Sequence, residues 1–108
     1  MNLPTEVFGE VIVVHAPEEL AAEQAELFAD FVPQLERQRV VLDLDGTETL
    51  DGGGLEALLE VQERLRGIGG DLKVSAAGAV NRKILEITRL DTQLEVFTSV
   101  LDAVKSYR

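Results

Sequence analysis

The chain has 108 residues, enough for one hydrophobic core and too few for two, so we expect a single domain over residues 1–108. It has no cysteine, which excludes disulfides and thiolate metal sites. Its net charge of −10 disfavours nucleic acid as a partner, and the lack of a long apolar run or a signal-like start predicts a cytoplasmic protein without membrane insertion.

Strands and a helix are expected in the first third of the chain. The β-branched run Val11 to Val14 predicts a strand, and a further strand is expected around Glu6 to Phe8. Pro17-Glu18-Glu19 predicts the start of a helix, because proline favours the first turn and acids favour the positive end of the helix dipole. Pro33 predicts that this helix kinks or ends near Val32. Its expected apolar face is Leu20, Leu27, Phe28, Phe31 and Leu35.

The rest of the chain continues the alternation. Val40-Val41-Leu42 is apolar on both faces, as expected of a central parallel strand. The later elements are a helix from Leu55 to about Arg66, a strand over Asp71 to Ala76, a helix from about Ala79 to Thr88 that buries Val80, Ile84 and Ile87, a strand over Leu94 to Phe97, and a last helix capped by Ser99. This order predicts an α/β fold with right-handed crossovers.

Three consecutive glycines, Gly52, Gly53 and Gly54, lie between the strand Arg39 to Leu44 and the following helix. Each costs about 1 kcal/mol relative to alanine in a helical turn, so an ordinary junction would not accumulate them. We therefore expect something to approach the backbone closely at this junction.

The junction and its surroundings resemble the STAS domain, the fold of bacterial anti-sigma factor antagonists. The resemblance is carried by Arg39-Val40-Val41-Leu42-Asp43-Leu44, Leu50-Asp51-Gly52-Gly53-Gly54-Leu55, Gly69-Gly70-Asp71-Leu72-Lys73-Val74, Ala79-Val80-Asn81-Arg82-Lys83-Ile84-Leu85 and the segment from Val96 to Val104. It extends over about residues 9 to 105. It implies a small mixed, mostly parallel sheet of four to five strands, with about four helices mainly on one face.

The resemblance also implies a function. In the family, an Asp-Ser-(Ser or Thr)-Gly-Leu motif opens the helix after the third strand, and a kinase-type anti-sigma factor phosphorylates its first hydroxyl residue. Asp51 and Gly54 match this motif, whereas Gly52 and Gly53 stand at the hydroxyl positions, so the usual phosphorylation switch is absent. Three hypotheses follow: permanent docking on the partner, an anion cradle, or a degenerate scaffold. Thr47 and Thr49 are alternative phosphoacceptors, although threonines entering a turn usually serve backbone hydrogen bonds.

The predicted docking surface is the junction from Asp51 to Leu55 together with the acids that project from the next helix, Glu56, Glu60 and Glu63. A purely solvated face, with Glu60 paired to Arg64, is the alternative for these acids. Gln62 is the polar exception within the apolar stripe and is expected to reach a backbone group.

Catalysis is not expected, because no serine has a nucleophile-elbow context, no phosphate-binding glycine motif occurs, and His15 is the only histidine. The leading hypothesis is therefore a protein-interaction module for a kinase-type anti-sigma factor, without cofactor or metal. A STAS subunit of a larger assembly, such as the regulator of an ABC lipid transporter or a stress-signalling scaffold, is the first alternative. The second is a divalent-cation or small-ligand domain using Asp43, Asp45 and Asp51.

Overall fold

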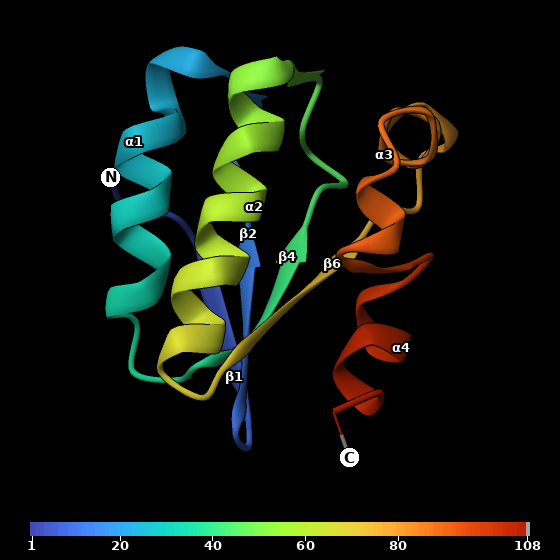
Figure 1. The fold of residues 1–108 in the computed structure, drawn as a ribbon. Helices are drawn as coiled ribbons and strands as arrows, with labels where there is room; N and C mark the ends of the chain where they lie inside the picture. Colours follow the sequence, from blue (N-terminus) through green and yellow to red (C-terminus); the bar gives the residue numbers. More distant parts are fainter. Residues whose placement is uncertain (108) are drawn as a thin grey trace.

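A five-stranded sheet forms the centre of the molecule in the computed structural model, which describes residues 1–107 (Figure 1). The strand order is β1-β2-β4-β6-β7, and all neighbours are parallel except the β1–β2 hairpin. The strands are β1 (Thr5–Phe8), β2 (Val11–His15), β4 (Arg39–Asp43), β6 (Asp71–Ser75) and β7 (Glu95–Phe97). The expected mixed, mostly parallel sheet is confirmed, including the strand near the N-terminus.

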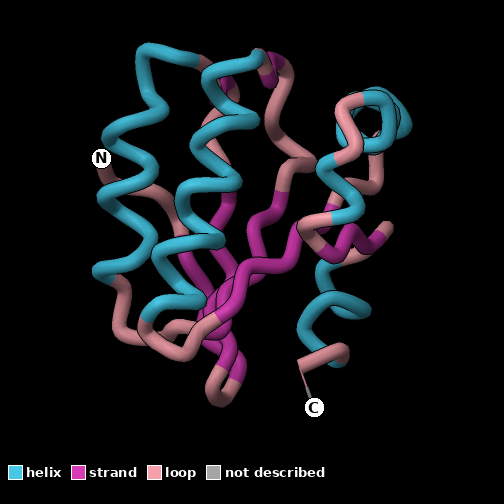
Figure 2. The backbone as a smooth tube through the Cα atoms, viewed as in Figure 1, coloured by secondary structure: helices cyan, strands magenta, loops and turns pink. Residues whose placement is uncertain are grey.

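Four α-helices cover the sheet, α1 (Ala22–Phe31), α2 (Gly52–Gly67), α3 (Ala79–Ile87) and α4 (Val100–Lys105), and two short 3₁₀ segments, Val32–Gln34 and Leu90–Thr92, follow α1 and α3 (Figure 2). Helices α1, α2 and α3 contribute to the larger core, whereas α4 packs with a smaller core on the other face of the sheet. The helices therefore lie mainly on one face, as the family resemblance implies.

The alternation of side chains along the strands explains the two cores. Ile12, Val40 and Leu72 are paired across β2, β4 and β6 and belong to the larger core. Val13 and Val41, one position further along, point to the opposite face and belong to the smaller core. Because both faces are covered, the consecutive central positions of β2 and β4 are apolar on both faces.

The predicted helix start at Pro17 to Glu19 is wrong. The segment Glu19–Leu20 is instead a short strand, β3, paired in parallel with β5 (Thr49–Leu50), and α1 begins only at Ala22. The Glu18 carbonyl accepts hydrogen bonds from Glu48 and Thr49 N–H groups, so this backbone is committed to strand pairing and cannot enter a helix.

The predicted apolar face of α1 is only partly correct. Leu20 and Phe28 are fully buried, but Leu27 is 55% exposed. Pro33 acts as expected: α1 ends at Phe31, and the chain continues as one 3₁₀ turn with the proline inside it.

The expected orientation of α3 is also wrong. Val80 and Ile87 are 73% and 71% exposed, and the buried positions are Asn81 and Leu85. Asn81 turns inward because its side-chain amide donates to the Leu44 and Thr47 carbonyl oxygens, at 3.2 and 3.0 Å. Asn81 therefore determines which face of α3 packs against the core, and Val80 and Ile87 on the opposite side are exposed to solvent.

Within residues 1–107, none of the helices is both long enough and apolar enough to cross a lipid bilayer.

Candidate functional site

The N-terminus of α2 is fixed by Asp51, the residue that precedes the helix. Asp51 has an extended backbone, and its Oδ1 accepts a hydrogen bond of 3.0 Å from the Gly54 N–H. Its other oxygen accepts from the Ala22 N–H at 3.4 Å. Asp51 therefore caps α2 and also ties it to the first residue of α1, which gives the junction a defined geometry.

Gly53 and Gly54 have no room for a side chain. A Cβ atom on Gly53 would lie 2.5 Å from the Ala22 Cα atom, and one on Gly54 would lie 2.8 Å from the Leu20 carbonyl carbon and closer still to its oxygen. The close approach expected at this junction therefore comes from the chain's own β3–α1 segment. These two glycines are required by packing.

Gly52 differs from the two glycines that follow it. A Cβ atom there would meet nothing within 4 Å, and the residue is exposed at the first position of α2. Packing does not require glycine at this position, so a serine or a glutamate would fit. The first N–H groups of a helix have no acceptor within the helix. At the start of α2, no side chain at position 52 covers these groups.

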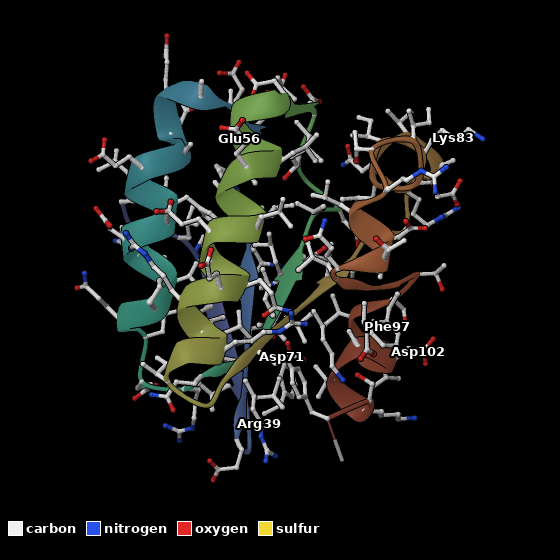
Figure 3. The ribbon with its side chains drawn as sticks, in the orientation of Figure 1. Arg39, Glu56, Asp71, Lys83, Phe97 and Asp102 are labelled. Atoms are coloured by element: carbon white, nitrogen blue, oxygen red, sulfur yellow. The ribbon has the colours of Figure 1, made fainter. Side chains whose placement is uncertain are left out.

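The three predicted acids on α2, Glu56, Glu60 and Glu63, are all exposed, and Glu56 lies on the upper, N-terminal part of the helix in Figure 3. Glu60 is not free, because its Oε1 lies 3.4 Å from an Arg64 guanidinium nitrogen, as the sequence alternative anticipated. Arg64 also bonds Asp30 and the Ala29 carbonyl, each at 2.9 Å, and so joins α2 to α1.

Gln62 is buried and connects α2 to β6. Its Oε1 accepts from the Leu72 N–H at 2.8 Å, and its Nε2 donates to the Leu72 carbonyl and to Asp71. The expectation that Gln62 reaches a backbone group is confirmed, and its role is structural.

The two candidate threonines occupy different environments. Thr47 is buried, and its hydroxyl donates to the Pro17 carbonyl oxygen at 2.8 Å. Phosphorylation of Thr47 would require this bond to break. Thr49 is exposed on β5.

The aspartates considered for a cation site are each engaged by backbone N–H groups of the chain. Asp43 accepts from the Asp45 N–H, Asp45 accepts from the Ala77 N–H, and Asp51 caps α2. In the part of the chain described, residues 1–107, no three His, Asp or Glu side chains are grouped so as to hold a metal ion. The three carboxylates therefore do not form the pocket that the sequence alternative required.

His15 lies between two carboxylates at the end of β2. Its Nδ1 is 2.8 Å from Asp43 and its Nε2 is 2.7 Å from Glu6, so both ring nitrogens have an acceptor when the ring is protonated. The hydrogen bond with Glu6 raises the pKa of His15 above its ordinary 6.5; burial opposes this, and the hydrogen bond and charge of Asp43 reinforce it. When protonated, His15 therefore links Glu6 on the edge strand β1 to Asp43 on the central strand β4.

We expect this cluster to make the stability of the protein depend on pH. Because the pKa is higher in the folded state, the contribution of His15 is complete below 6.5 and is lost as pH rises through the folded pKa. The measurement is the melting temperature of the wild type minus that of His15→Gln, taken from about pH 5.5 to about pH 9. The difference should shrink with rising pH, and Glu6→Gln should weaken the effect. A difference that does not change with pH would contradict this assignment.

The sequence predicts that the apolar stripe on α3 is buried, whereas the structure leaves most of it exposed. Val80, Ile84 and Ile87 form it, and Ile84 is half-buried while the other two are exposed. The signal in the sequence was Asn81, since a buried amide on one side of a short helix turns the opposite side outward. Through Asn81, α3 is held against the connection that leads from β4 toward Asp51, which rises between α2 and α3 (Figure 1). The stripe is a candidate interaction surface.

Comparison with known families identifies the class of protein. The family model of the STAS domain matches residues 2–103, so the chain belongs to the STAS domain family. A comparison with curated protein sequences finds no match.

Solved structures of the same fold include anti-sigma factor antagonists and a transporter family protein. A Thermotoga maritima protein assigned as an anti-sigma factor antagonist superposes with a TM-score of 0.84 at 20% identity, covering 96% of this chain and 92% of its own. An anti-sigma factor antagonist from Mycobacterium paratuberculosis gives 0.76 at 24% identity, covering 97% and 92%. A sulfate transporter family protein from Wolinella succinogenes gives 0.78 at 20% identity, covering 94% and 87%. At these identities the likeness shows the fold.

Proposed function

We propose that this STAS domain is a non-catalytic protein-interaction module of the anti-sigma factor antagonist type, which docks on a kinase-type anti-sigma factor in the cytoplasm. The docking surface is the N-terminal end of α2, from Asp51 to Leu55, extended by Glu56, Glu60 and Glu63 and by the apolar stripe of α3. In this proposal the domain is not phosphorylated at the usual position, and binding is therefore constitutive.

The observation that carries the proposal is the difference among the three glycines. Gly53 and Gly54 are required by contacts with Ala22 and Leu20, but Gly52 faces open space. The resemblance to the family motif assigns the phosphoacceptor position to Gly52. A phosphate there would add roughly two negative charges at the N-terminal end of α2. Glycine leaves the surface uncharged at that point and permits close approach of a partner backbone.

A second candidate function is that of a STAS subunit in a larger assembly, such as a transporter. The similarity to the Wolinella succinogenes transporter family protein favours it. In that case the apolar stripe of α3 would pack against a neighbouring subunit. Isolation of the protein from its host with bound partners, followed by mass spectrometry, separates the two candidates: an ATP-binding anti-sigma kinase supports the first, and a transporter subunit supports the second.

The decisive substitution is Gly52→Glu, which places a negative charge where the phosphate would stand. We expect affinity for the anti-sigma kinase, measured by calorimetry, to fall at least tenfold, about 1.4 kcal/mol. Folding should not suffer, because the site has room and an acid at a helix N-terminus is stabilising by about 0.3–1 kcal/mol.

The matched control is Gly67→Glu at the other end of α2, where a Cβ atom also meets nothing within 4 Å. It makes the same chemical change and should leave affinity unaltered. Gly52→Ser should bind normally and should accept phosphate from the kinase when ATP is supplied. Unchanged affinity of Gly52→Glu would remove the tip of α2 from the interface.

A further inference from the structure

A groove on the α4 face of the sheet is separate from the proposed docking surface. It has a volume of about 520 Å³ and lies between the β1–β2 turn and α4, near Arg39 at the lower end of β4 in Figure 3. Helix α4 has only six residues and contacts β2, β4, β6 and β7. The part of this face next to the β1–β2 turn is therefore left open. The volume falls in the range of small-molecule sites, about 300–1,000 Å³.

The walls of the groove are apolar. Phe8 and Val11 are opposite each other on β1 and β2, so their side chains share a face, and Val11 belongs to the smaller core. Leu101 and Val104 line the groove from α4. Phe8 is 48% exposed and Leu101 is 61% exposed, so two large apolar side chains meet solvent here.

The lining of the groove carries a net positive charge in a protein that is acidic as a whole. Arg39 and Lys105 line it together with one acid, Glu10, so the lining carries two positive charges and one negative, a net +1, against −10 for the chain. Across residues 1–107, neither Arg39 nor Lys105 has a carboxylate within 4.0 Å. Two cations beside apolar walls match a ligand with one anionic head and an apolar body.

We propose that this groove binds a small amphiphilic carboxylate, with its head group at Arg39 and Lys105 and its chain along Phe8, Val11, Leu101 and Val104. A polyanion such as a nucleotide is a poorer match, because most of the lining is apolar and Glu10 opposes added negative charge. A second copy of the chain is also a poorer match, since both copies carry a net charge of −10 and repel each other.

The test uses octanoate as the probe and the uncharged octan-1-ol as its comparison, with the complete 108-residue chain followed by heteronuclear NMR. Octanoate should shift the resonances of Phe8, Val11, Leu101 and Val104 and should bind at least tenfold more tightly than octan-1-ol. The double variant Arg39→Gln/Lys105→Gln should remove that preference for the charged head, and Leu101→Gln should weaken both ligands.

The matched control is Val80→Ser/Lys83→Gln on α3, which removes an apolar and a cationic group from an exposed apolar surface elsewhere on the molecule. It should not change octanoate binding. The proposal is overturned if octanoate and octan-1-ol bind equally, if the shifted resonances lie on α3, or if the groove is covered by self-association of the protein. None of these results tests the junction from Asp51 to Leu55, which Gly52→Glu tests, so the two proposals fail independently.

Discussion

Gly54→Ala is expected to destabilise the fold by at least about 3 kcal/mol, which is more than most single substitutions achieve. The added methyl group would lie 2.8 Å from the Leu20 carbonyl carbon, and this neighbour is backbone, so no side-chain rotation can relieve the contact. Relief would require β3 to move away from α2, which would disturb the pairing of β3 with β5 and bury Leu20 less well.

Thermal or urea unfolding of Gly54→Ala and Gly52→Ala measures the effect. For a domain of this size, 3 kcal/mol corresponds to a fall of roughly 12 °C or more in melting temperature. Gly52→Ala should instead raise stability by about 0.5 kcal/mol, since it restricts the unfolded chain and meets no neighbour. Equal effects of the two substitutions would show that the close approach of Leu20 to Gly54 does not constrain the junction.

The fold was largely predictable because its strands carry strong local signals. The runs Val11 to Val14 and Val40 to Leu42 are β-branched or aliphatic on both faces, and only a sheet covered on both sides explains such runs. Pro33 predicted the end of α1 for an equally local reason. By contrast, the β3 strand depends on residues 49–50, about 30 positions away, and no local pattern reveals that pairing.

The candidate site was predictable in its location but not in its detail. Three glycines in succession indicated a close approach of other atoms to this backbone. The sequence could not show that Leu20 and Ala22 are the neighbours, or that Gly52 has no close neighbour. That distinction depends on how α1 lies against α2. The groove beside α4 gave no sequence signal at all, because Phe8, Leu101 and Arg39 come together only through the sheet.

Asn81→Leu is the second substitution with a large expected effect, although it replaces a polar residue with an apolar one inside a helix. The buried Asn81 amide supplies hydrogen bonds to the Leu44 and Thr47 carbonyl oxygens, which leucine cannot replace. The Thr47 carbonyl oxygen would lose this donor, at about 1–3 kcal/mol, whereas the Leu44 carbonyl oxygen would keep its hydrogen bond from the Thr47 N–H, so we expect a loss of about 2 kcal/mol.

The comparison variant for Asn81→Leu is Val80→Ser, one position earlier. Val80 is 73% exposed, so removing this apolar side chain should change stability by less than about 0.5 kcal/mol. Chemical denaturation of the two variants decides which face of α3 is buried, since the hydrophobic pattern alone predicts the opposite order. If Val80→Ser were the more damaging change, the stripe of Val80, Ile84 and Ile87 would belong to the core. The apolar part of the proposed docking surface would then be lost.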